Sequence, residues 1–176
     1  MSESDSHELT KYLHMISDLE RISDHAVGVL ASVEEMRAKG IHFSDSATRE
    51  LDGMVRALLE TLDLAVGAYE DNDLDKALRV EPLKQIVDAL KTELRSRHIR
   101  RMQKGVCTIE AGFVWSDLLT NLGRVADHCA NIAGCVMEMS QSRLDLHDYS
   151  KALREGNRDY SQIYDQYAEK YLQPLG

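Results

Sequence analysis

The sequence contains few of the residues that form turns and end helices. Its 176 residues include only 2 prolines and 10 glycines, and a chain with so few turn-forming residues has room for few loops. No stretch alternates apolar and polar residues for long enough to predict a strand. Apolar residues recur instead at spacings of three and four, as on one face of a helix. We therefore expect an all-α fold, an antiparallel bundle of about five long helices.

The sequence also lacks a disulfide pattern, a long apolar run and a positive net charge. Its three cysteines, Cys107, Cys129 and Cys135, have no CxxC spacing, which suits a reducing cytoplasm and indicates no cysteine-rich zinc site. The uncharged runs fall short of the ~20 residues that span a bilayer, and the acidic start MSESDSHE is unlike a signal peptide. A net charge of -9 argues against nucleic acid as a partner, because Lys and Arg must neutralise its phosphates.

One segment departs from this acidic character. The sequence RSRHIRRMQK at 95–104 has two interpretations, an attraction to an anionic surface or a solvated helix end whose carbonyl dipoles favour cations. The composition by itself favours the helix end.

The apolar spacing predicts where the helices begin and end. We expect them at about 7–40, 44–70, 74–104, 108–140 and 146–173. Pro82 removes a backbone hydrogen bond inside the third helix, so we expect a bend or interruption there.

The last predicted helix carries tyrosines at steps of four, three and four, at Tyr160, Tyr164, Tyr167 and Tyr171. This spacing places them on one face. Tyrosine suits half-buried positions, so we expect this face to pack on the bundle, with a partner-binding surface as the alternative.

Two segments a hundred residues apart are imperfect copies of each other. DLERISDHA at 18–26 and NLGRVADHCA at 121–130 align at an offset of 103. The offset pairs arginine with arginine, aspartate with aspartate and histidine with histidine, but it pairs Glu20 with Gly123. We infer an internal duplication of helical units.

The first copy contains a possible metal edge. Glu20 and Asp24 are four residues apart, which places both carboxylates on one helical face. A cation would need further carboxylates from a facing helix, and the alternative is a solvated acidic face. His25 points about 100° away from Asp24, so we expect His25 and His128 to pack or form hydrogen bonds.

Motifs for other chemistry are missing. HELTK at 7–11 has a lysine where a zinc protease needs its second histidine. No Glu-x-x-His, Gly-rich phosphate loop or GxSxG occurs. We expect Trp115 to be a core or interface residue.

A family resemblance lies in the two copies and in three further segments, FSDSATREL at 43–51, VEPLKQIVDAL to ANIA at 80–133 and HDYSKALR at 147–154. Through these segments the chain resembles the PhoU-like family. The closest likeness is to the cytoplasmic C-terminal domain of bacterial sodium/phosphate cotransporter-related proteins, over nearly the whole chain. The resemblance implies a domain of three-helix units, a role in controlling phosphate uptake, and metal clusters held by (E/D)xxxD motifs.

In the light of this resemblance, 1–176 is interpreted as one PhoU-like domain. Residues 44–140 would form its second three-helix unit, 7–40 the last helix of the first unit, and 146–173 an additional C-terminal helix. The chain departs from the family pattern at Gly123 and Lys84, where the family has glutamates.

These departures shape the expected metal site. The candidate ligands are Glu20, Asp24, Asp88 and Asp127, with iron or zinc as the ions that the resemblance implies. Because one carboxylate is lost and another is replaced by a cation, we expect iron or zinc to bind weakly or not at all.

The expected function is regulatory and non-catalytic. We expect a cytoplasmic protein at the inner face of the membrane that forms a homodimer and works with a membrane phosphate transporter segment or subunit, in control of phosphate uptake or sodium/phosphate cotransport. The alternatives are a metal-dependent hydrolase or oxidase that uses Glu20, Asp24 and Asp127, and a free-standing cytoplasmic scaffold.

Overall fold

A computed structural model describes residues 3–141 and 160–175 of the chain. It contains four long helices, α1 (Glu3–Lys39), α2 (Asp45–Asp71), α3 (Leu74–Gln103) and α4 (Ile109–Gln141). Residues 160–171 are also helical, and the short 3-10 helix η1 (Gln173–Leu175) follows them. The described residues include no strand, so the predicted all-α class is confirmed. Residues 146–159 of the expected last helix lie outside the described ranges.

The turns between the helices follow from local chemistry. Ser44 and Asp73 act as N-caps, because their side-chain oxygens accept hydrogen bonds from the backbone N–H groups of Ala47 and Lys76. Gly40 and Gly105 adopt positive φ angles of 63° and 68° just past α1 and α3, a conformation that glycine adopts without steric cost.

Proline does not interrupt the third helix. The helix α3 is continuous from Leu74 to Gln103 with the buried Pro82 inside it, so the helix is not interrupted there, and the bend expected at Pro82 stays a prediction. Pro82 removes only the backbone hydrogen bond to the carbonyl of Leu78, and Leu78 itself is 38% exposed.

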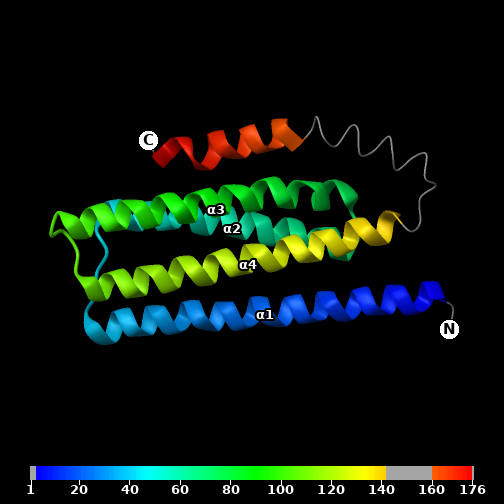
Figure 1. Cartoon of the computed structure of the whole chain (residues 1–176), viewed down its shortest axis with the longest axis horizontal. Coiled ribbons are helices and arrows are strands. Elements are labelled where there is room, and N and C mark those ends of the chain that lie inside the picture. Colours follow the sequence, from blue (N-terminus) through cyan, green and yellow to red (C-terminus); the bar gives the residue numbers. More distant parts are fainter. Residues whose placement is uncertain (1–2, 142–159, 176) are drawn as a thin grey trace.

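The helices form a bundle in which α4 contacts α2 and α3 on one side and α1 on the other (Figure 1). The main core lies between α2, α3 and α4 and includes Met54, Leu83, Leu90 and Leu119, all fully buried. This packing positions the charged side chains of α3 and α4 at the edges of the core.

Trp115 and the C-terminal tyrosines join this core. Trp115 is buried and donates from Nε1 to the carbonyl of Leu94 at 3.3 Å, so its predicted core role is confirmed. Tyr167 and Tyr171 are buried as well, and the Tyr167 hydroxyl accepts from Arg79 at 2.9 Å. The tyrosine face therefore packs on the bundle, as predicted.

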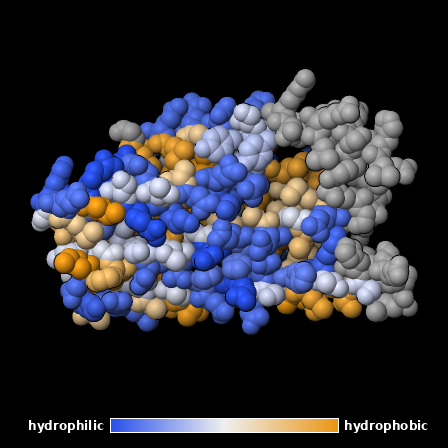
Figure 2. Space-filling model, in the orientation of Figure 1, coloured by the Kyte–Doolittle hydropathy of each residue, from blue (hydrophilic) through white to orange (hydrophobic). Residues whose placement is uncertain are grey.

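None of the described helices contains a segment long and apolar enough to cross a membrane. Figure 2 shows a surface on which hydrophilic residues dominate, with hydrophobic patches along the edge where α1 lies.

Candidate functional site: a lysine–carboxylate cluster between α3 and α4

A lysine lies where the resemblance places a metal-binding carboxylate. Lys84 and Asp88 are one turn apart on α3, and Asp127 lies across from them on α4. The Lys84 ammonium is 2.7 Å from Asp88 Oδ2 and 3.3 Å from Asp127 Oδ1. One ammonium group thus bridges the two carboxylates that were predicted as metal ligands.

A second lysine completes this cluster. Lys91 Nζ is 3.0 Å from Asp88 Oδ1, and its chain passes over the backbone of Gly123. A Cβ atom built on Gly123 would lie 3.0 Å from both Cδ and Nζ of Lys91. The space next to α4 where a longer side chain at position 123 would begin is therefore filled by Lys91. We call Lys84, Asp88, Lys91 and Asp127 the lysine–carboxylate cluster.

The electrostatics of the cluster favour its charged forms. Partial burial opposes ionisation of Asp88, but hydrogen bonds from Lys84 and Lys91 outweigh it and lower the pKa of that carboxyl. The hydrogen bond to Asp88 raises the pKa of Lys84, against the opposing effect of partial burial. Both groups are therefore ionised at neutral pH.

The other two predicted ligands lie elsewhere. Glu20 and Asp24 are exposed on α1, and the described residues contain no group of three or more His, Cys, Asp or Glu side chains that could hold a metal ion. The structure brings together Asp88 and Asp127, with a lysine between them. These residues do not fit a multinuclear metal site, because the position that a cation would share is taken by an ammonium group.

The repeated histidines form a reciprocal contact between α1 and α4. His25 Nδ1 lies 2.9 Å from Asn121 Oδ1, and His128 Nδ1 lies 2.7 Å from Asp18 Oδ1. The two rings stack at 5.6 Å. The prediction that the histidines pack or form hydrogen bonds is confirmed.

Sequence reasoning missed the partners of these histidines. Asp18 and Asn121 are themselves paired by the offset of 103, and each precedes its repeat's histidine by seven residues. This shared spacing of two helical turns was the available signal. The two copies thus meet along equivalent faces, with a charged acceptor on α1 and a neutral one on α4.

The fold and the cluster define an all-helical bundle protein with an internal repeat and carboxylate positions on facing helices. Residues 51–136 match the PhoU domain, a range that begins in α2 and includes the whole lysine–carboxylate cluster. The match covers 86 of the 176 residues, just under half of the chain.

Two curated relatives are named as PhoU homologs. The chain is 23% identical over 145 residues to the phosphate-specific transport system accessory protein PhoU homolog 1 of Thermotoga maritima, a match that covers 82% of this chain and 61% of the relative. It is 30% identical over 129 residues to the phosphate-specific transport system accessory protein PhoU homolog of Borreliella burgdorferi, covering 71% and 57%. The matches thus span about three fifths of each relative's length. No solved structure matches the chain.

Proposed function

We propose that the chain is a non-catalytic regulatory module in the control of phosphate uptake. The observation that carries this proposal is the PhoU domain match across α2, α3 and α4. Both curated relatives are named as accessory proteins of a phosphate-specific transport system. By analogy with these accessory proteins, this chain would act through contacts with a transporter.

The lysine–carboxylate cluster supports a non-catalytic role. A carboxylate that acts as base, nucleophile or metal ligand must be available to the reacting group. Asp88 and Asp127 instead share the ammonium of Lys84. The cluster is built to hold α3 and α4 together.

The proposed partner is a membrane phosphate transporter at the inner face of the membrane, and in particular a sodium/phosphate cotransporter. The test is uptake of radiolabelled phosphate by cells with and without the chain, in sodium and in potassium buffer. We expect loss of the chain to alter uptake only when sodium is present. A sodium-independent change would retain the regulatory role and exclude the cotransporter, and unchanged uptake in both buffers would contradict the role itself.

An enzyme is the alternative that a turnover assay can detect. Purified protein would be screened for phosphatase and oxidase activity with added manganese, iron or zinc. Metal-dependent turnover that disappears in Asp24→Ala would replace the regulatory proposal with the enzymatic one. A scaffold without a membrane partner would be indicated if no transporter co-purifies with the chain and uptake is unaffected by its loss.

We also propose that the cluster binds iron or zinc weakly or not at all. Two ammonium groups lie at the carboxylates, and a cation would have to displace them. Metal analysis and titration calorimetry of the purified protein test this. A stoichiometric submicromolar site that is lost in Asp127→Asn would contradict it.

Self-association through α1 is proposed from the repeat. Ile16 and Leu30 are 59% and 54% exposed on α1, and the offset of 103 pairs them with Leu119 and Ala133, which α4 buries in the core. The face of α1 that carries Ile16 and Leu30 corresponds to the buried face of α4, but the described helices leave it exposed. Exposed apolar faces of this kind mark contact surfaces.

A second copy of this chain is the proposed partner for that face. Light scattering at high micromolar concentration would give a dimer mass, which Ile16→Asp with Leu30→Asp would reduce to the monomer. Leu59→Asp is the matched control, because Leu59 is similarly exposed on α2. A monomeric mass for the unmodified chain would contradict the proposal.

A further inference from the structure

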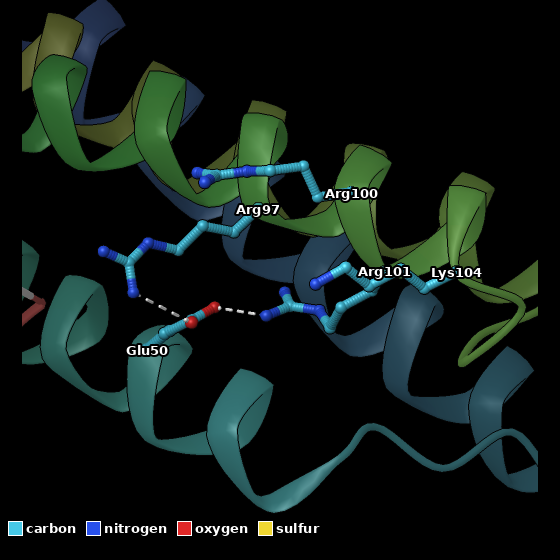
Figure 3. A pocket seen from close by; sticks show the side chains of 5 residues that line it. All are labelled: Glu50, Arg97, Arg100, Arg101 and Lys104. Carbon is cyan, nitrogen blue, oxygen red and sulfur yellow. Dashed lines mark hydrogen bonds and ion pairs between the residues drawn. The ribbon is translucent and has the colours of Figure 1, made fainter.

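A basic groove lies where α3 ends beside the beginning of α2. It has a volume of about 310 Å³ and is lined by Glu50, Arg97, Arg100, Arg101 and Lys104. Figure 3 shows Arg97 and Arg101 reaching from α3 toward Glu50 on α2, with Arg100 and Lys104 on the same stretch of α3. We call these five residues the basic groove.

The groove carries more positive than negative charge. Its lining has four cations and one carboxylate, a local charge of 4 - 1 = +3, in a chain whose net charge is -9. Glu93, just outside the lining, pairs with Arg97 at 2.8 Å and Arg100 at 3.1 Å, which still leaves a surplus of two. An anion entering the groove would meet this uncompensated charge.

Glu50 holds two of the arginines in place. Its side chain is only 10% exposed, and its two oxygens accept from Arg101 Nη1 at 2.8 Å and Arg97 Nη1 at 3.5 Å. The alternative explanation for the cations, that they serve the carbonyls at the end of α3, does not apply to these two guanidinium groups, because they donate across to α2.

Arg101 presents an unused pair of donors. Its Nε and Nη2 atoms are buried and have no hydrogen-bond partner among the described residues. These two nitrogens lie on one edge of the planar guanidinium, the edge that binds two oxygens of a phosphate side by side. Both atoms are covered from solvent, so a ligand reaches them only if the groups around this edge of Arg101 move apart.

We propose that the basic groove binds a phosphate group that carries two or more negative charges. The Arg101 edge would hold two of its oxygens, and the exposed Arg100 and Lys104 would neutralise the remaining charge. The phosphate can belong to a free phosphate compound or to a phospholipid headgroup, since the groove recognises the chemistry that they share. This inference concerns a site outside the lysine–carboxylate cluster and stands independently of the role in phosphate uptake.

The single tryptophan of the chain reports on this groove. The Arg101 guanidinium lies over the Trp115 ring at 5.5 Å from its centre. A ligand that binds this guanidinium therefore changes the environment of the indole. We would titrate the full chain at low salt with inorganic phosphate and with pyrophosphate while recording tryptophan fluorescence. We expect a saturable change, stronger binding of pyrophosphate, and weakening as salt screens the charges.

Three variants separate the groove from general charge. Arg100→Gln with Lys104→Gln removes two exposed cations and should weaken pyrophosphate binding about tenfold or more. Arg101→Lys keeps the charge but loses the two-donor edge, and we expect a loss of similar size. Arg95→Gln removes an exposed cation from the same helix outside the groove and should change binding less than twofold. Circular dichroism would confirm that each variant is folded.

Vesicle sedimentation distinguishes the two sources of phosphate. Vesicles of phosphatidylcholine with and without phosphatidic acid would be mixed with the chain and the same variants. Binding of pyrophosphate without binding of the acidic vesicles supports a free phosphate compound, and binding of the vesicles that the groove variants abolish supports a headgroup. The proposal is overturned if neither probe binds, or if Arg95→Gln weakens binding as much as Arg100→Gln with Lys104→Gln.

Discussion

Replacing Lys84 by methionine tests whether the lysine–carboxylate cluster links α3 to α4. The change keeps an unbranched apolar stem of similar length but removes the ammonium that lies 2.7 Å from Asp88 and 3.3 Å from Asp127. Both carboxylates are about a third exposed, so water screens each ion pair, and exposed pairs contribute ~0.2–1 kcal/mol each. Two such pairs, with the repulsion between the carboxylates left behind, give an expected loss of about 1–2 kcal/mol.

The loss would be measured by urea unfolding followed by circular dichroism, with the midpoint of thermal unfolding as a second measure. For a chain of this size about 1 kcal/mol corresponds to a shift of roughly 2–4 °C. Arg124→Met is the matched control. Arg124 is 62% exposed and lies 3.5 Å from Asp127 on the same helix, so this substitution should lower the free energy of unfolding by less than about 0.5 kcal/mol.

A double-mutant cycle isolates the contact between the helices. Lys84→Met with Asp127→Asn should cost less than the sum of the two single changes, because either one already breaks the same ion pair. Full additivity, or a Lys84→Met variant as stable as the unmodified chain, would refute the reasoning that the cluster connects α3 and α4.

The same variant should alter the dependence of stability on pH. The pKa of Asp88 is lowered in the folded protein, chiefly by Lys84 and Lys91 against the effect of burial. The stabilisation is therefore fully present above the unfolded pKa of about 4 and is lost as pH falls through the lowered folded pKa. Lys84→Met should lose less stability than the unmodified chain between pH 5 and pH 3, as measured by urea unfolding.

Two further predictions concern α1 and α2. Asp18→Ala should destabilise the protein by about 1–3 kcal/mol in urea unfolding, because it leaves the partly buried His128 without its acceptor; a loss below about 0.5 kcal/mol would show that the contact contributes little. Gly28→Ala should also destabilise, since its Cβ would lie 2.7 Å from Asn121 Oδ1, whereas Gly53→Ala, with no atom within 4 Å, should stabilise α2 by up to ~1 kcal/mol. Equal shifts in melting temperature for the two glycine variants would contradict this difference.

Restoring carboxylates should create the metal site that the unmodified cluster lacks. Lys84→Glu with Gly123→Glu would place up to four carboxylates on the facing surfaces of α3 and α4, with Lys91 shifting away from position 123. We expect this variant to bind iron or zinc more tightly than the unmodified chain in titration calorimetry. Equal affinity in the two proteins would show that the lysine and the glycine do not determine metal binding.

The sequence by itself determined the helical class and the approximate bounds of α1 to α4. Hydrogen bonds within a helix join residues four apart, and the cap of Ser44 reaches only three residues, so a short window of sequence contains the information. The burial of Tyr167 and Tyr171 followed from the spacing of the tyrosines in the same way. Pro82 does not interrupt α3, because one lost backbone hydrogen bond does not outweigh the packing of the buried residues around it.

The tertiary structure decided which side chains of different helices meet. Glu50 and Arg101 are 51 residues apart, and Asp18 and His128 are 110 residues apart, so no local pattern pairs them. The sequence showed that Gly123 lacks a carboxylate, but only the packing of α3 on α4 shows that Lys91 fills the space beside it. Helix formation depends on neighbours along the chain, whereas the contacts between helices depend on how their faces pack. The ion pairs Glu50–Arg101 and Lys84–Asp127 join different helices, so only this packing brings their charged groups together.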